Sequence, residues 1–195
     1  MEQKKEDRRV RKTKRLLRQG LSQLMLQKSI KDITVRELAE LVDINRGTFY
    51  IHYRDIYDMV SQVEAEMFEE FSAILARHEN DFSVSPEERA ISFLEDAFAY
   101  IADNKDMCMA LLGKNGDIAF LNDMQKIIQD KCLQMMGNLL PQVEPQILEY
   151  HFKFISAGCT AVVRSWLVNG MNETPAQIAR LAYHMIVGSL AQPVQ

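Results

Sequence analysis

Hydrophobic residues recur at helical spacing along the whole chain. The first stripe, within residues 8–28, consists of Val10, Leu17, Leu21 and Leu24. Their spacing by seven, four and three positions puts them on one face of a helix, with basic residues on the other faces. A longer stripe, which predicts a helix over 56–77, consists of Ile56, Val60, Val63, Met67, Phe71 and Ile74. No segment alternates with period two, so the sequence predicts an all-α fold of about nine helices.

Two short helices are predicted between these stripes. Thr34 and Glu37 have the spacing of a capping box, in which the Thr34 hydroxyl accepts from the Glu37 amide and the Glu37 carboxylate reaches back. That helix ends near Val42, and Asn45 is a good N-cap for another helix over 46–53. Two short helices joined by a tight turn form a helix-turn-helix, whose second helix can enter the major groove of DNA.

The second half of the chain also predicts helices throughout. Ser85 and Glu88 fit a capping box, and a stripe that includes Phe98 follows them. Apolar spacing and caps predict further helices over 107–112, 121–139, 145–169 and 174–190. The third of these ends at Gly170, a residue favoured just beyond helix C-termini.

Charge is distributed unevenly along the sequence. The formal net charge of -4 over 195 residues argues at first against a nucleic-acid partner. However, residues 1–60 hold 14 basic and nine acidic residues, whereas residues 61–195 hold nine basic and 18 acidic ones. Nine of the basic residues lie within the first 18 positions, where they would attract a phosphate backbone. We therefore expect the two parts to face different partners.

Composition and motifs exclude several classes of protein. The three cysteines, at spacings of 24 and 27, fit neither a disulfide framework nor a metal or redox motif. The first residues lack the apolar core of a signal peptide, and the longest charge-free run, 181–195, is shorter than the about 20 residues of a membrane span. We expect a cytoplasmic protein that has no membrane contact, no metal and no cofactor.

Enzyme signatures are absent as well, so no catalytic residue is predicted. The sequence contains no HExxH, GxSxG or GxGxxG pattern, and its four histidines share no metal-binding spacing. A site assembled in space from His151 and Cys108 stays open as an alternative. An all-α enzyme or scaffold, in which the N-terminal helices are only structural, also stays open.

The predicted helix over 46–53 has two distinct faces at 100° per residue. Phe49 falls on one face, and we expect it to pack on Leu38, Leu41 and the first helix. The residues on the opposite face are Arg46, Gly47 and Tyr50. Arginine can donate a bidentate pair to a guanine edge, glycine permits close approach of the backbone, and a tyrosine hydroxyl suits a phosphate oxygen.

At these residues the sequence resembles the DNA-binding domain of the TetR/AcrR transcriptional regulators. The matching residues are Ile33-Thr34-Val35, Leu38-Ala39, the run from Ile44 to Tyr50, His52-Tyr53 and Asp55. The resemblance covers about residues 8–75. It implies a helix-turn-helix DNA-binding domain over 1–55 and a helical regulatory and dimerisation domain over 56–195, with the connecting helix at 56–77. The DNA contacts it implies are Thr34, Arg36, Arg46, Gly47, Thr48, Tyr50, His52 and Tyr53.

Two positions depart from the family pattern. The residue after Asp55, commonly a lysine that contacts phosphate, is Ile56 here, so Arg54 is the candidate to supply that contact. The usual glycine of the turn is Asp43, which tolerates a left-handed conformation at some cost. A weaker resemblance, around residues 115–117 and 166–170, is to a C-terminal type common among Gram-positive members.

Methionine and aromatic residues beyond residue 90 are candidates for an effector pocket, because thioethers adapt to varied ligands. The candidates are Phe98, Met109, Phe120, Met124, Met135, His151, Phe154 and Arg164. The same residues could equally form the core, and Arg164 suits either an acidic ligand or an interface carboxylate. The expected effector is a small apolar or amphipathic molecule.

The last two helices are too apolar for the surface of a monomer, which predicts a homodimer with a four-helix interface. The candidate interface residues are Trp166, Ile178, Leu181 and Met185. Such a homodimer would bind a near-palindromic site on double-stranded DNA, with recognition helices roughly 34 Å or somewhat more apart. We therefore expect a repressor released by an effector. An activator, or a regulator controlled by a protein partner without a small-molecule inducer, stays open.

Overall fold

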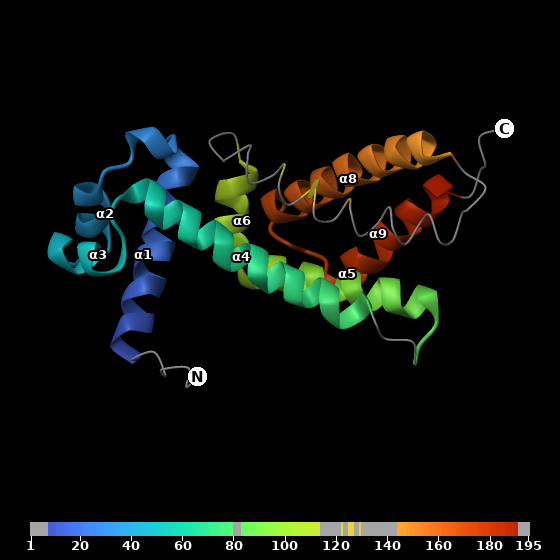
Figure 1. The fold of residues 1–195 in the computed structure, drawn as a ribbon, viewed down its shortest axis with the longest axis horizontal. Helices are drawn as coiled ribbons and strands as arrows, with labels where there is room; N and C mark the ends of the chain where they lie inside the picture. Colours follow the sequence, from blue (N-terminus) through green and yellow to red (C-terminus); the bar gives the residue numbers. More distant parts are fainter. Residues whose placement is uncertain are drawn as a thin grey trace. The chain divides into compact units, whose positions relative to one another are not determined.

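The computed structural model describes residues 8–79, 83–113, 122, 125, 126, 129 and 144–190. Over these residues it contains eight α-helices, one short 3-10 helix and no strand, which confirms the all-α prediction (Figure 1). The helix expected over 121–139 lies mostly outside the described residues. Helical conformation is assigned there at residues 122, 125, 126 and 129.

Contacts divide the chain into two compact units. The N-terminal unit comprises Met1–Met67 with Asp106–Asp117, and the C-terminal unit comprises Phe68–Lys105 with Ile118–Gln195. Helix α4 (Ile56–Glu79) is continuous in sequence through both units. The division into domains at residue 55 stays a prediction.

The N-terminal unit is built on α1 (Arg8–Gln27), α2 (Val35–Leu41) and α3 (Arg46–His52), together with the start of α4 and most of α6 (Lys105–Leu112). The 3-10 helix η1 (Ile30–Asp32) connects α1 to α2. The predicted stripe residues Leu17, Leu21 and Leu24 are buried, as is the whole stripe of α4. The apolar spacing therefore identified the buried faces of both long helices.

Helices α1 and α2 approach closely at Gly20. A Cβ at this position would lie 2.4 Å from Val42 Cγ1 and 2.8 Å from Leu38 Cδ1, so only glycine leaves room for those side chains. Leu38 is fully buried there, whereas Leu41 is 48% exposed. Leu41 reaches this core only in part, because its Cδ2 would lie 3.7 Å from the same Cβ while about half of the residue stays exposed.

The C-terminal unit is built on α5 (Pro86–Asp103), α8 (Pro145–Val168) and α9 (Pro175–Leu190), with α9 packed along α5 and against α8 (Figure 1). Its core joins one aromatic residue from α5 and one from α8, Phe98 and Trp166, whose ring centroids are 5.4 Å apart in an edge-on arrangement. The α9 residues in this core are Ile178, Ala179 and Ala182. The indole N–H of Trp166 donates to the Glu173 carbonyl at 3.0 Å, so its polar atom is satisfied.

The predicted caps form in most places. Both bonds of the capping box at Ser85 and Glu88 are present, and so are both at Thr174 and Gln177. Gly170, with φ of 84°, closes α8 in a Schellman arrangement, since the Met171 amide donates to the Trp166 carbonyl at 2.9 Å. The box at Thr34 is only half formed, because the Glu37 carboxylate binds Lys28 Nζ and not the Thr34 amide.

The turn between α2 and α3 depends on a left-handed residue. Asp43 adopts φ of 53° and is exposed, as expected of a residue that replaces glycine there.

We expect Asp43→Gly to be at least as stable as the native chain, and Asp43→Ala to be less stable than Asp43→Gly by about 1 kcal/mol. Denaturant unfolding of the two variants measures this difference. Equal stability of the two would contradict the assigned backbone strain.

Candidate nucleic-acid interface

Helix α3 is oriented by one buried aromatic residue. Asn45 caps its start, its side-chain oxygen accepting from the Gly47 amide at 2.7 Å. Phe49 is fully buried and packs against Tyr53, with ring centroids 5.6 Å apart. This anchor turns Arg46, Gly47 and Tyr50 outward, where all three are exposed, as the helical angles predicted. The exposed face lies in solvent, where it could enter the major groove of DNA.

The residues at the start of α2 are also exposed. Thr34 caps the helix by accepting from the Glu37 amide at 3.2 Å. The Arg36 Nε donates to Glu40 Oε1 at 2.8 Å, and this hydrogen bond raises the pKa of Arg36. Arg36 therefore has a carboxylate partner that a phosphate would need to displace.

Three other predicted contacts in and just after α3 are less accessible. Thr48 and His52 are half-buried, and Tyr53 is only 4% exposed. Burial of the Tyr53 ring beside Phe49 gives it a packing role in the core. That Tyr53 contacts DNA stays a prediction. Because the ring is buried, only the hydroxyl group could make such a contact.

The turn from α3 to α4 is fixed by two aspartates and Arg54. Asp55 accepts from the Asp58 amide, and Asp58 accepts from the Arg54 amide, each at 2.8 Å. The Arg54 guanidinium reaches the same Asp58 carboxylate at 3.0 Å. The backbone hydrogen bond from Arg54, and then its side chain, lower the pKa of Asp58. The Arg54 side chain is 87% exposed, and it is already paired with the Asp58 carboxylate.

The buried side chain of Ile56 explains the first departure from the family pattern. Ile56 is buried in the core of the N-terminal unit, so its side chain cannot reach a phosphate. Of the two residues considered for that contact, only Arg54 is exposed.

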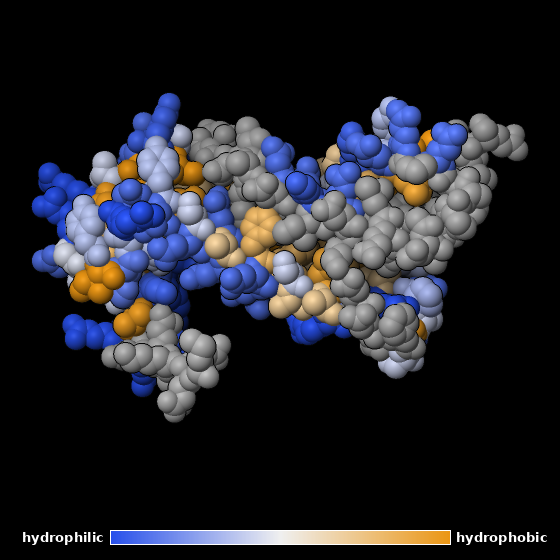
Figure 2. Space-filling view, in the orientation of Figure 1, coloured by the Kyte–Doolittle hydropathy of each residue, from blue (hydrophilic) through white to orange (hydrophobic). Residues whose placement is uncertain are grey.

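Basic residues are concentrated in the same unit, on α1. Helix α1 carries seven of them, Arg8, Arg9, Arg11, Lys12, Lys14, Arg15 and Arg18. Figure 2 shows hydrophilic residues gathered over the N-terminal unit, with smaller hydrophobic patches among them. A concentration of positive charge in the unit that carries α3 favours attraction of a polyanion.

One exposed apolar residue of α3 was missed in the sequence. Ile51 is 76% exposed, although it was not named among the candidate contacts. At 100° per residue it falls beside Gly47 on the outward face, so the helical angles already placed it there. Its apolar side chain cannot bind a phosphate or a hydrogen-bonding group of a base, which distinguishes Ile51 from the predicted contacts.

The described candidate effector residues differ in burial and in the element that carries them. Phe98 is in the core, His151 of α8 is half-buried, and Phe154 of α8 is 70% exposed. Arg164 is exposed on α8, and Met109 belongs to α6 of the other unit. Phe120, Met124 and Met135 lie outside the described residues.

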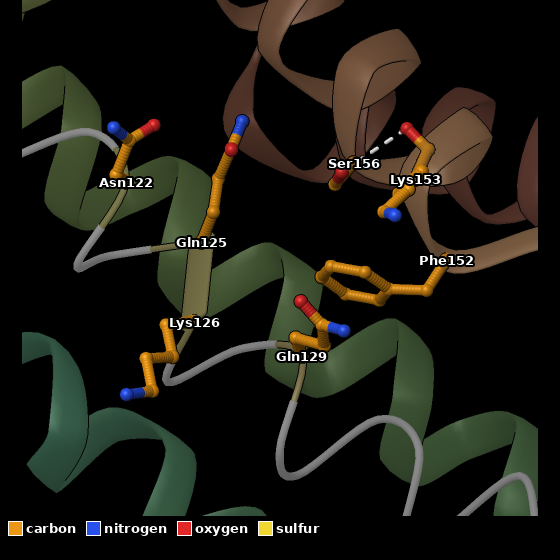
Figure 3. Close-up of a pocket in the computed structure, with 7 residues that line it drawn as sticks. All are labelled: Asn122, Gln125, Lys126, Gln129, Phe152, Lys153 and Ser156. Atoms are coloured by element: carbon orange, nitrogen blue, oxygen red, sulfur yellow. Dashed lines mark hydrogen bonds between the residues drawn. The ribbon is translucent and has the colours of Figure 1, made fainter. Parts of the chain in front are cut away.

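The C-terminal unit contains a different pocket of about 400 Å³. It is lined by Asn122, Gln125, Lys126, Gln129, Phe152, Lys153 and Ser156 (Figure 3). Phe152 is buried and supplies an aromatic wall, whereas the other lining residues are polar. The Lys153 ammonium is bonded to Glu149 at 2.7 Å. Among the described residues, none of those predicted to bind an effector lines this pocket.

The candidate interface residues divide into two groups. Trp166 and Ile178 are buried within the C-terminal unit, so their side chains are not available to a second chain. Leu181 and Met185 are exposed on α9. On α8 the exposed large hydrophobic residues are Tyr150, Phe154 and Val168.

Other kinds of site find no support in the part of the chain that the structure describes. No group of three His, Cys, Asp or Glu side chains is arranged to hold a metal there. Among the same residues, no helix is long and apolar enough to cross a membrane. Burial raises the pKa of Cys108 to about 12, against the opposite influence of Arg18, so its thiol is a poor nucleophile.

Comparison with known proteins agrees with this picture. Residues 88–188 match the family TetR_C_8, a transcriptional regulator C-terminal region. No curated protein matches the sequence.

Three solved structures share the fold at low identity. A TetR-like transcriptional regulator from Rhodococcus sp. RHA1 is 19% identical, with a TM-score of 0.71 over 96% of this chain and 99% of that one. The fatty acid degradation regulator FadR from Bacillus halodurans is 14% identical, with a TM-score of 0.70 over 97% of this chain and 100% of that one. FadR from Bacillus subtilis, solved in complex with stearoyl-CoA, is 10% identical, with a TM-score of 0.68 over 90% and 98%.

Proposed function

Because the chain belongs to the TetR family of transcriptional regulators, we propose that it acts as a homodimeric repressor that a small-molecule effector releases from a near-palindromic operator. The family consists of DNA-binding regulators and not of enzymes. The observation that carries the proposal is the outward face of α3, held in place by the fully buried Phe49, in the same unit as the basic residues of α1.

Each exposed residue of this interface has a distinct role in the proposal. Arg46 donates to a guanine edge in the major groove, and Gly47 lets the helix backbone approach the bases. The Tyr50 hydroxyl and the side chains of Thr34 and Arg36 bind phosphate oxygens and fix the orientation of the protein. Arg54 reaches a phosphate once it leaves Asp58.

Operator binding is tested by selection of duplexes from a random DNA library with the purified full-length chain. We expect a near-palindromic consensus and an affinity that falls steeply with salt concentration. Arg46→Ala should lose about 1–3 kcal/mol on the selected duplex and accept more sequences, because a base contact is lost. Lys12→Ala should weaken selected and unrelated duplexes alike. Binding without sequence preference would contradict the proposal.

The homodimer is supported by the exposed apolar residues of α8 and α9. Phe154 and Val168 on α8 are 70% and 68% exposed, and Leu181 and Met185 lie exposed on α9. Paired helices from two chains would bury these side chains in a four-helix arrangement. Trp166 and Ile178 then act behind the interface, by fixing the positions of α8 and α9.

Dimerisation is tested by a charge placed on this surface. Met185→Asp should weaken the dimer by about 3 kcal/mol, more than 100-fold, because an unpaired carboxylate would be buried. Val84→Asp, at an exposed apolar residue just before α5, is the matched control and should leave the dimer intact. Analytical ultracentrifugation over a concentration series measures both. A Met185→Asp dimer as tight as that of the native chain would exclude this interface.

The effector site that we infer is the pocket beside Phe152. Its amide and ammonium groups suit an anionic or hydrogen-bonding head group, and the ring of Phe152 suits an apolar portion. An amphipathic anion has both an anionic head group and an apolar portion. Stearoyl-CoA, the ligand of the Bacillus subtilis structure, is such a molecule. It serves as the first probe, beside coenzyme A and stearate.

Effector binding is tested by thermal unfolding and by release from the selected duplex. An effector at 100 times its Kd should stabilise the chain by about 2.7 kcal/mol and weaken operator binding by about 5- to 150-fold. Lys153→Met should reduce both effects, whereas Lys105→Met, an exposed lysine outside the pocket, should not. In a reporter strain, the effector should raise transcription. A fall in transcription would identify an activator instead.

A further inference from the structure

The most exposed large hydrophobic side chain among the described residues lies on the recognition helix. Ile51 is 76% exposed, Tyr50 is 58% exposed, and Phe49 is fully buried. Single apolar residues on a surface are common and need no ligand. The position of Ile51 is what distinguishes it, because α3 is the helix proposed to enter the major groove.

Ile51 shares the outward face of α3 with the residues proposed to contact bases. It lies four positions after Gly47 and therefore one turn along the same face, whereas Tyr50 and Arg46 lie about 100° and about 140° around the helix from it. A Cβ at Gly47 would meet only the cap oxygen of Asn45, at 3.2 Å, so the space beside Ile51 is open to a ligand. The base edge that Gly47 admits would come directly under the Ile51 side chain.

We propose that Ile51 reads the C5-methyl group of a thymine in each half-site of the operator. This inference rests on the proposed function of α3. An isoleucine has no donor for a phosphate or for a base nitrogen, so a polar contact is closed to it. Thymine carries the methyl group of the major groove, and aliphatic side chains recognise it by apolar contact.

The surroundings of Ile51 favour DNA over a protein partner. An apolar protein patch would need further apolar neighbours on this face, whereas the residues one turn before Ile51 are Gly47 and Thr48. The basic residues of α1 belong to the same unit and favour a polyanion. In the major groove of DNA, single thymine methyl groups lie among hydrogen-bond acceptors and donors. One apolar side chain on a face that also carries an arginine suits such a surface.

The test replaces thymine by deoxyuridine, which removes the methyl group and nothing else. Duplexes selected by the native chain are remade with each thymine of the half-site changed in turn, and binding is measured for the native chain and for Ile51→Ala. At one thymine per half-site, we expect the native chain to lose about fourfold per methyl group. Ile51→Ala should already have lost that affinity and should not distinguish the two bases there.

Neither variant in this test should disturb the fold. Ile51→Ala removes exposed atoms from a helix and replaces them with a better helix former, so its unfolding free energy should be unchanged. Leu41→Ala, at an exposed leucine of the same unit but on α2, is the matched control and should keep the native preference for thymine.

Three results would overturn the inference. If the native chain selects an operator but no thymine-to-deoxyuridine change depends on residue 51, Ile51 does not read a methyl group and the proposed function stands. If Ile51→Ala weakens thymine and deoxyuridine duplexes equally, the side chain packs on sugar or on other protein atoms. If the native chain selects no sequence, the proposed function fails first and this inference fails with it.

Discussion

The burial of Phe49 is the interaction on which the DNA-binding interface depends. Its side chain is fully enclosed in the N-terminal unit, and it lies in the middle of a helix of only seven residues. So short a helix has little stability of its own and takes its direction from tertiary packing. With Phe49 inside, the helical angles leave Arg46, Gly47, Tyr50 and Ile51 outside. The chemistry of the interface therefore follows from one apolar contact.

Local signals in the sequence were sufficient to predict most of the helices. Apolar stripes located α1 and α4, and the caps at Ser85, Thr174 and Gly170 formed as their spacing indicated. These features involve residues at most a few positions apart, so the rest of the fold has little influence on them. The outward face of α3 was predictable for the same reason.

Features that depend on tertiary contacts were not predictable in the same way. Glu37 binds Lys28, nine positions earlier, and this pair forms only because α1 and α2 meet. Gly20 admits Leu38 and Val42 most closely and leaves Leu41 48% exposed, and Trp166 is buried because Phe98 lies across it from α5. In each case the helical period gave the correct spacing, but the packing of a second helix decided which side became the interior.

The bond between Arg54 and Asp58 has a consequence for the thermodynamics of DNA binding. An arginine that is already neutralised by a carboxylate carries little unbalanced charge into the complex. When it moves to a phosphate it exchanges one anionic partner for another and leaves the Asp58 carboxylate to water. The contact then gains only the difference between the two pairings, together with the counterions that the duplex releases. Arg54 would therefore contribute more to the orientation of the protein along the backbone than to its affinity.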